Sequence, residues 1–371
     1  MESKKNVAVI GSGSISEQYL TNMINFYKNL NVVGCSASNI EHAKKRAAQF
    51  NIKAMTNEEI FADPSIDIVV ILVPTPVHAT LIEQALNAGK HVYTEKTISE
   101  NTKDATRLLK LADEKGLYLG SAPDTFMGAA LQEARRILDE GTIGEPLSFS
   151  LNINRNVEFL ASIFNFLRMP GGGLAYDYGV YYFTALVSLL GPVKDVFSVV
   201  KNLSTERTNV FPQSPDFGKK YEYNNESQLY ALLNLESGIT GTVSMNGDSV
   251  IMDIPYFYIY GTKGILKLSC ANDFGGDLEV TLNPEGFNPP PVKTFKGSSP
   301  ITGEKRGIGP AEMALAIDEN RPNRASKEMA YHVLDLIETI MKSSNEKKCL
   351  EVTSTCKIPA PLTDDVIAKL I

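Results

Sequence analysis

The chain has 371 residues, of which 43% are hydrophobic and 21% charged, a globular composition long enough for two domains. Its net charge of -7 excludes a nucleic-acid binder that works by neutralising phosphates. Four scattered cysteines do not have the spacing of a disulfide scaffold or a zinc site. With neither a secretory leader nor about 20 consecutive apolar residues, we expect a cytoplasmic protein without a membrane span.

The first predicted element is a buried strand over residues 7–10, followed by a glycine turn over 11–13 and an amphipathic helix from Ile15. A second strand is predicted over residues 30–38. A strand, glycine turn, helix and strand within about 30 residues are typical of a dinucleotide-binding fold.

The glycine turn is the predicted site for the pyrophosphate of the dinucleotide. Gly11 allows a tight turn, and Gly13 lets the phosphates approach the backbone. The helix N-terminus at Ser14 and Ile15 supplies N–H groups that lack a helical partner. Ser16 replaces the third glycine of the G-x-G-x-x-G fingerprint, so a turn with a purely structural role is the alternative.

The end of the second strand bears on the choice of cofactor. An NAD site usually carries Asp or Glu about 20 residues after the glycines, where it accepts hydrogen bonds from the ribose 2′-OH. This chain has no carboxylate there, and we expect Ser36, Ala37 and Ser38 to lie at the ribose. The absence of an acid favours NADP over NAD, although no arginine stands in this stretch to bind the 2′-phosphate.

Strands and helices continue to alternate, which predicts a Rossmann-type, doubly wound parallel sheet domain over residues 1–122. Ligands of such sheets bind beyond the carboxyl ends of the strands. Two strands end at Pro74-Thr75 and at Glu95-Lys96, so we expect these four residues to line the cofactor crevice.

From residue 123 to residue 371 the pattern changes to many strands without helices between them, which indicates a mainly antiparallel sheet. We expect a helix from the glycines at 171–173 to Leu190 and a surface loop over 288–310. A C-terminal helix over about 326–343 is expected to pack back on the body.

The segment "GGGLAYDYGVYY" raises the central question of the second domain. Asp177 and Tyr181 are four residues apart and would share one helix face, about 5–6 Å apart at Cβ. They either hold a substrate hydroxyl or serve as a helix cap and a core aromatic.

Three motifs in this order resemble the Gfo/Idh/MocA oxidoreductases: the glycine turn, the Glu95-Lys96 strand end and the glycine-led helix with Asp177. The resemblance covers essentially the whole chain. Residues 122–146 and 320–338 are similar to a Gram-positive bacterial branch of the family. The resemblance to the family implies an enzyme that uses NAD(P) to act on sugars and polyols. It also implies that the open-faced sheet of the second domain forms a homodimer or homotetramer.

The resemblance also implies roles for particular residues. Lys96 matches the family's Glu-Lys-Pro lysine, which contacts nicotinamide and substrate, while Thr97 replaces the proline. Asp177 matches the family aspartate, and Tyr181 stands where most members carry histidine. An ordinary tyrosine, with a pKa near ~10, acts better as an acid than as a base, which suits carbonyl reduction. We therefore expect Lys96 and Tyr181 to hold the substrate oxygen in a cleft between the domains, with Asp177 orienting a hydroxyl or the lysine.

Each of these residues has a simpler interpretation. Asp177 is otherwise a helix cap or surface acid, Tyr181 a core residue and Lys96 a solvated charge. His78 either lines the cofactor cleft or caps a helix. Further candidate substrate contacts are Asp124, Asn154, Arg168 and Tyr182. Acids and histidines show no metal-ligand spacing, so no metal is expected.

Two other functions fit the same sequence. A non-catalytic dinucleotide or sugar sensor would explain the departures at Ser16, Thr97 and Tyr181, but it has no need of Lys96 and Asp177. A lyase or glycosidase with a tightly held NAD(P) would keep the cofactor and show no net redox turnover.

Overall fold

A computed structural model describes residues 4–252, 255–284 and 290–371. By its contacts the chain divides into two compact units. Unit 1 comprises the described residues up to Gly128 together with Ile301–Tyr331 and Pro359–Ile371, and unit 2 comprises Ala129–Pro300 and His332–Ile358. The domain limits of 1–122 and 123–371 stay a prediction.

Unit 1 contains a six-stranded parallel sheet, which confirms the predicted Rossmann-type architecture. The strand order is β3-β2-β1-β4-β5-β6, the order of a dinucleotide-binding fold. All four residues of β4 are buried, as expected for a strand covered on both faces. The strands are β1 (Lys5–Ile10), β2 (Leu30–Ser36), β3 (Lys53–Ala54), β4 (Ile68–Ile71), β5 (His91–Thr94) and β6 (Leu119–Ser121).

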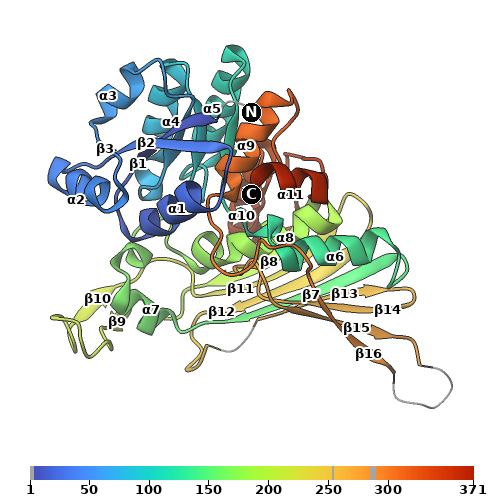
Figure 1. The fold of residues 1–371 in the computed structure, drawn as a ribbon. Coiled ribbons are helices and arrows are strands. Elements are labelled where there is room, and N and C mark those ends of the chain that lie inside the picture. The colour runs from blue at the N-terminus through green and yellow to red at the C-terminus, as the bar shows by residue number, and fades with distance from the viewer. Residues whose placement is uncertain (1–3, 253–254, 285–289) are drawn as a thin grey trace. The chain divides into compact units, whose positions relative to one another are not determined.

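Helices connect and cover these strands (Figure 1). Polar side chains begin several of them: Asn39 caps α2, Asn101 caps α5, and Thr56 forms a capping box with Glu59 at α3. The helices are α1 (Ser14–Asn25), α2 (Ile40–Phe50), α3 (Asn57–Ala62), α4 (His78–Asn87), α5 (Thr102–Lys115), α9 (Ile308–Asp318) and α11 (Asp364–Leu370).

The predicted surface loop over 288–310 is wrong in two places, because β16 (Val292–Lys296) and the start of α9 fall within it. Every residue from Ile308 to Ala316 is buried. A helix that is buried all round has no alternation of polar and apolar faces, so its sequence carries no helical period.

Unit 2 contains a nine-stranded sheet in the order β16-β15-β14-β13-β7-β12-β11-β8-β17. Within this sheet, β12 and β7 are the only described strands that pair in parallel, and the other pairs are antiparallel. This confirms a mainly antiparallel sheet. Its remaining strands are β7 (Pro146–Asn154), β8 (Val193–Lys201), β11 (Gln228–Leu235), β12 (Thr240–Asn246), β13 (Tyr256–Gly261), β14 (Gly264–Leu268), β15 (Asp277–Leu282) and β17 (Leu350–Glu351). A separate small hairpin joins β9 (Glu206–Thr208) and β10 (Lys220–Glu222).

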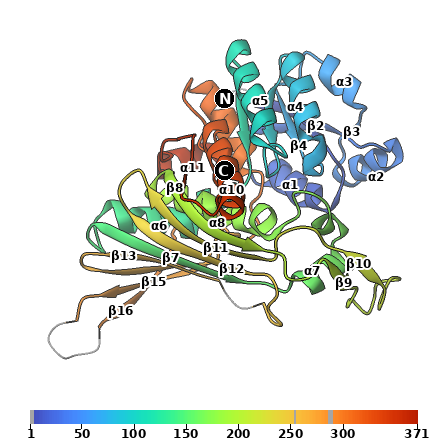
Figure 2. The same cartoon turned by 180° about the vertical axis from the view of Figure 1, so that it is seen from behind.

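Helices α6 (Ala129–Asp139) and α8 (Val180–Leu190) lie along one face of this sheet (Figures 1 and 2). Helix α10 (Lys327–Glu346), where the sequence predicts a C-terminal helix, contacts β8 through Ser343, whose hydroxyl accepts from the Ser198 N–H at 3.1 Å. Side chains alternate between buried and exposed along β8 and β11, so the opposite face presents side chains to solvent.

The segment before α8 differs from the predicted single α-helix. Helix α7 (Val157–Ile163) and a 3₁₀ turn (Asn165–Arg168) precede the glycines. Residues Ala175–Gly179 then form a π-helical turn that runs directly into α8. Such turns are rare and often occur at functional sites. Across the described part of the chain, no helix has both the length and the apolar character of a membrane-spanning segment.

Candidate active site

The glycine turn of unit 1 leaves the N-terminus of α1 open. Gly11 has a φ of 113°, and a side chain there would overlap the Leu72 carbonyl oxygen, so the fold itself requires this glycine. Gly13 is different, because it is exposed and a Cβ placed on it meets nothing within 4 Å. No side chain caps α1, which begins at Ser14. Its first N–H groups are therefore available to an anionic ligand.

Ser16 explains how the turn tolerates the loss of the third glycine. Its hydroxyl donates a hydrogen bond to the Gly13 carbonyl oxygen at 2.6 Å, and the side chain is fully buried. The serine therefore ties the turn together from the inside and does not project toward a ligand.

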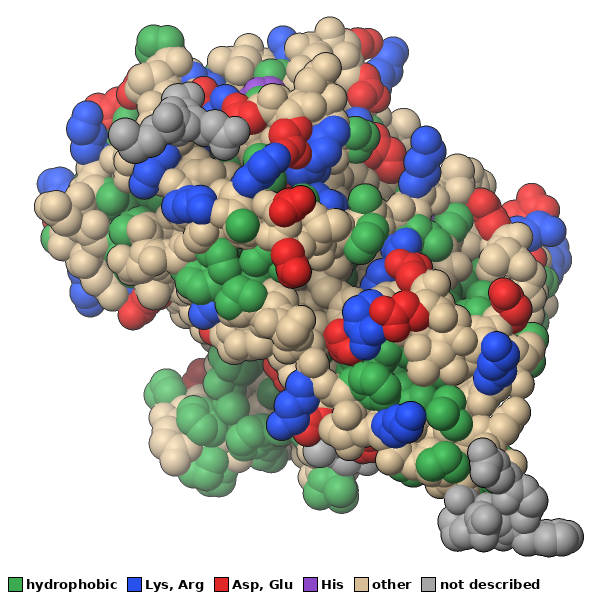
Figure 3. All heavy atoms as spheres, turned by 45° about the vertical axis from the view of Figure 1, so that its right-hand side comes forward, with side chains coloured by type: hydrophobic (Ala, Val, Ile, Leu, Met, Phe, Trp, Pro, Cys, Tyr) green, Lys and Arg blue, Asp and Glu red, His purple; other side chains and the backbone are tan. Residues whose placement is uncertain are grey.

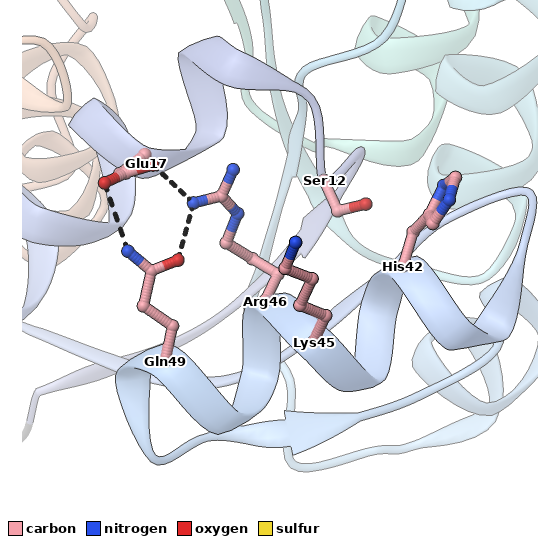
Figure 4. Close-up of a pocket in the computed structure, with 6 residues that line it drawn as sticks. All are labelled: Ser12, Glu17, His42, Lys45, Arg46 and Gln49. Atoms are coloured by element: carbon pink, nitrogen blue, oxygen red, sulfur yellow. Dashed lines mark hydrogen bonds and ion pairs between the residues drawn. The ribbon is translucent and has the colours of Figure 1, made fainter.

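A pocket lies beside the turn, lined by Ser12 and by side chains of α1 and α2 (Figure 4). Arg46 donates to Glu17 at 2.8 Å and to the Gly13 carbonyl oxygen at 3.2 Å. Gln49 bridges the same pair, donating to Glu17 and accepting from Arg46. The lining residues are Ser12, Glu17, His42, Lys45, Arg46 and Gln49.

This pocket supplies the basic groups that are missing at the end of β2. The basic residues at 42, 45 and 46 are spaced by three and four residues, which puts them on one face of α2. Sequence reasoning missed them because it looked for an arginine directly after the strand. The helical spacing of these residues was the available signal.

The predicted ribose contacts after β2 have different surroundings. Ser36 is fully buried and donates to Asn57 Oδ1 at 2.6 Å, so its hydroxyl is engaged within the protein. Ala37 is half-buried and Ser38 is exposed. Asn39, next along the chain, caps α2 by accepting from the Glu41 N–H.

The end of β5 holds Glu95 and Lys96 in defined positions. One Glu95 carboxylate oxygen accepts from the Tyr19 hydroxyl at 2.8 Å, and the other accepts from the Lys96 N–H at 3.0 Å. The Lys96–Thr97 peptide bond is cis. Lys96 is half-buried, so its backbone is anchored while its side chain retains access to solvent.

The ring of His78 contacts the chain just after β4 and just after β5, where the cofactor crevice is predicted. Its side chain is fully buried, with Nδ1 2.7 Å from the Thr97 carbonyl oxygen and Nε2 2.8 Å from the Val73 carbonyl oxygen. Burial lowers the pKa of His78, which favours the neutral ring. Pro74 and Thr75 lie between these contacts, with Pro74 exposed and Thr75 half-buried.

In unit 2, Asp177 lies in the π-helical turn and Tyr181 in the first turn of α8. Asp177 is half-buried, and its N–H donates to the Gly173 carbonyl oxygen at 2.8 Å. Tyr181 is buried, and its ring centroid is 6.3 Å from that of Tyr178. The Arg155 guanidinium lies over the Tyr178 ring at 4.1 Å, which places a cation beside the turn that carries Asp177.

The other predicted substrate contacts have partners within their own units. Tyr182 is buried, with its hydroxyl 3.4 Å from Cys270 Sγ, and burial raises its pKa far above the ordinary value. Arg168 donates to the Ala161 carbonyl oxygen at 2.8 Å and stacks on the Tyr221 ring. These contacts give both side chains packing roles.

Asp124 and Asn154 also have partners within their own units. Asp124 is fully buried and accepts from the N–H groups of Gly307 and Gly309 at 3.2 and 3.1 Å, so it caps the start of α9. Burial raises the pKa of Asp124 to about 7. The Asn154 side chain donates to Asn152 Oδ1 at 3.3 Å.

Comparison with known proteins identifies the family. Residues 5–122 match the model of the oxidoreductase family with an NAD-binding Rossmann fold, and residues 131–267 match the Gfo/Idh/MocA C-terminal domain. Together the two matches span well over half of the chain. The protein belongs to the Gfo/Idh/MocA family of oxidoreductases.

Curated relatives include other oxidoreductases. An uncharacterised oxidoreductase of Schizosaccharomyces pombe is 34% identical over 166 residues, 44% of each chain. The D-xylose dehydrogenase of Paenarthrobacter nicotinovorans is 27% identical over 53% of this chain and 49% of its own. The matches to these relatives thus span about half of their length. A scyllo-inositol 2-dehydrogenase (NADP(+)) of Bacillus subtilis is 23% identical over 79% of this chain and 81% of its own.

Solved structures share the fold of this Gfo/Idh/MocA protein. A levoglucosan dehydrogenase in complex with NADH is 19% identical, with a TM-score of 0.81 over 95% of this chain and 100% of its own. An NAD-binding oxidoreductase from Klebsiella pneumoniae is 20% identical, with the same TM-score, over 95% of this chain and 99% of its own.

The residues of unit 1 fit the nicotinamide dinucleotide that the family implies. The open α1 N-terminus and the side-chain-free Gly13 suit a pyrophosphate. The basic pocket beside them suits a further anionic group on the adenosine half of the cofactor.

Proposed function

We propose that this protein is an NAD(P)-dependent dehydrogenase or reductase of a hydroxyl or carbonyl group in a sugar, polyol or related compound. The observation that carries the proposal is the start of α1 at Gly13, which has no side-chain cap and no side chain in front of it, as a helix N-terminus that binds a pyrophosphate requires. The xylose and scyllo-inositol dehydrogenases among its relatives support the substrate class. The nicotinamide supplies the hydride acceptor or donor when it is bound.

We assign the proton chemistry to Lys96 and Tyr181. Both are proposed to hold the substrate oxygen, where a protonated tyrosine in place of the family's usual histidine donates a proton to a developing alkoxide. Asp177 orients a substrate hydroxyl or the lysine. The anchored backbone of Lys96 and the burial of every residue of α8 support these roles, since a group that positions a substrate must itself be fixed.

NADP is the proposed cofactor. The His42, Lys45 and Arg46 side chains form a basic pocket next to Gly13, and the end of β2 has no acid to accept a ribose 2′-OH. A 2′-phosphate in the pocket would gain charge-assisted hydrogen bonds. It would also compete with Glu17, which holds Arg46 in this structure.

We further propose a homodimer or homotetramer through the open face of the nine-stranded sheet. Phe197, Val199, Tyr230 and Leu232 project from this face and are each between 42% and 45% exposed. Strand pairing sets Tyr230 opposite Val199 and Leu232 opposite Phe197, so the four side chains are contiguous. A contiguous apolar patch of this kind is typical of an interface.

The surface charge supports a small-molecule substrate. On the face shown in Figure 3, the basic and acidic side chains of the described residues are interspersed and form no continuous basic surface. Together with the net charge of -7, this disfavours a nucleic-acid partner. We also propose that the chain belongs to the Gram-positive bacterial branch of the family and acts in the cytoplasm; the scattered cysteines support the cytoplasmic location.

The test is a spectrophotometric screen of sugars, polyols and dicarbonyls with NADP(H) and NAD(H), using wild type beside Lys96→Ala and Tyr181→Phe. Wild type is expected to turn over at least one compound, and each variant to lose about 10²- to 10⁴-fold in kcat/KM while still binding NADPH. Turnover that survives in both variants would contradict the assigned roles. Cofactor binding without any turnover would favour a sensor, and a bound cofactor that survives gel filtration would favour a lyase or glycosidase.

A further inference from the structure

Two of the three glycines before Asp177, Gly172 and Gly173, are closely packed against neighbouring residues. A Cβ on Gly172 would lie 2.5 Å from the Phe166 carbonyl oxygen, and one on Gly173 would collide with the Glu226 carboxylate. Gly171 has a φ of 79°, which favours glycine. Gly172 and Gly173 therefore let the chain pass between the preceding 3₁₀ turn and Glu226.

Asn225 and Glu226, which lie just before β11, form hydrogen bonds to the residues on either side of the three glycines. The Asn225 amide donates to the carbonyl oxygens of Leu167 and Met169 at 2.9 and 2.8 Å. On the other side of the glycines, Glu226 Oε1 accepts from the Ala175 N–H at 2.8 Å. The first contact fixes the entry to the segment, and the second fixes the start of the π-helical turn.

Ser227, the next residue, connects Asn225 and Glu226 to the nine-stranded sheet through its own hydrogen bonds. The Ser227 N–H donates to the Lys201 carbonyl oxygen at the end of β8, at 2.9 Å. The Ser227 hydroxyl donates to Asp248 Oδ2 at 2.6 Å, and its carbonyl oxygen accepts from the Gly247 N–H. The chain directly after Asn225 and Glu226 is thus attached to the sheet.

We propose that Asn225 and Glu226 are positioning residues that hold the π-helical turn, and with it Asp177, in the geometry that catalysis needs. This inference rests on the proposed function, since it assigns Asp177 a part in the reaction. Asp177 follows Ala175 by two residues, so a displacement of the Ala175 backbone moves the carboxylate directly. Misplacement of a reacting group by about 1 Å can cost ~10²-fold in rate.

Because Glu226 can ionise, its effect on the π-helical turn should depend on pH, whereas the effect of a residue that only packs there would not. Burial raises the pKa of Glu226 to about 7. When ionised, its bond to the Ala175 N–H is charge-assisted and stronger, so the turn is held more firmly above that pH than below it. The titratable groups that interact with Glu226 are Tyr176 and Tyr223. Glu338 in turn acts on Tyr176, and Arg207, Tyr221 and Asp177 act on Tyr223.

The decisive variant is Glu226→Gln, because glutamine keeps the size and the acceptor oxygen but cannot ionise. In wild type, kcat is expected to fall by about tenfold as pH is lowered through the pKa of Glu226, and in Glu226→Gln this acid limb should vanish. KM for the cofactor should stay unchanged, because the cofactor residues lie in unit 1. A Glu226→Gln enzyme with the wild-type kcat and pH profile would overturn the proposal.

Amide hydrogen exchange gives a second readout that needs no turnover. In Asn225→Ala and Glu226→Gln, exchange over residues 169–181 should accelerate about tenfold or more, while β8 and β12 keep their protection. Unchanged exchange over this segment would overturn the proposal. If wild type turns over no substrate, the proposed function fails, and the exchange experiment still decides whether these two side chains hold the turn.

Discussion

Arg46 on α2 is the residue that the proposed cofactor preference depends on most. Arg46 lines the pocket beside Gly13, and removing its guanidinium would take away the proposed charge-assisted hydrogen bond to a 2′-phosphate. In Arg46→Ala we expect NADPH to bind about 10- to 100-fold more weakly, with NADH binding unchanged. Calorimetric titration with both cofactors measures this difference.

The matched control for that experiment is Lys44→Ala. Lys44 is also on α2, but it pairs with Glu41 at 2.8 Å and does not line the pocket. Its loss should leave both affinities unchanged. An equal loss of NADPH and NADH affinity in Arg46→Ala would show that the arginine supports the turn and does not select the phosphate.

The residue types in the sequence predicted some positions of the site better than others. Gly11 is predictable because the backbone geometry of the turn demands glycine there. Gly13 is predictable for a different reason, because the motif leaves room at this position for a pyrophosphate to approach the backbone. Tyr182 and Asp124 are polar residues near predicted strand and helix ends, but the structure buries both against partners that lie far along the chain. Such partners leave no local pattern, so burial is the property that a single sequence does not reveal.

At the scale of elements, Asp124 makes the attachment of α9 sensitive to pH. Its pKa is raised to about 7 by burial, above its ordinary value, so the folded state binds its proton more tightly than the unfolded state. The resulting stability is full at low pH and is lost as pH rises from about 4 through 7, by about 4 kcal/mol at most.

Urea unfolding of wild type and Asp124→Asn at several pH values tests this coupling. We expect the free energy of unfolding of wild type to fall more steeply between about pH 4 and pH 7 than that of the variant. Asparagine keeps an acceptor oxygen but does not titrate, so any change that it makes in hydrogen bonding is the same at every pH. The slopes are therefore compared and not the absolute values. Parallel curves would show that Asp124 does not titrate in this range.

Helices and strands were predictable from the sequence wherever hydrophobic residues recur with a regular helical or strand spacing. The alternating strands and amphipathic helices of the first third carry such periods, and the structure contains them in the Rossmann strand order. Helix α9 carries none, because it is buried on all sides. The π-helical turn at Ala175–Gly179 was also missed, since a π turn and an α turn draw on the same residue types.

At the scale of the whole molecule, the open face of the nine-stranded sheet predicts self-association. Leu232→Glu places a charge in the middle of the contiguous apolar patch, which would have to be desolvated in an interface. Wild type is expected to sediment as a dimer or tetramer, and the variant as a monomer at micromolar concentration.

Val210→Glu is the control for that experiment, because Val210 is exposed but lies outside this sheet, between β9 and β10. It should leave the assembly unchanged. If Leu232→Glu sediments like wild type, the open face is not the interface.

The measurement that tests the central claim most directly is calorimetric titration of NADPH into wild type and Gly13→Val. A Cβ at Gly13 meets no atom within 4 Å and the backbone φ of -67° is ordinary, so we expect the variant to fold with an unchanged unfolding temperature. We predict that wild type binds NADPH and that Gly13→Val does not, because the valine occupies the space of the pyrophosphate. A folded, cofactor-free wild type that binds no nicotinamide dinucleotide, or a variant that binds it equally well, would contradict the assignment of this site.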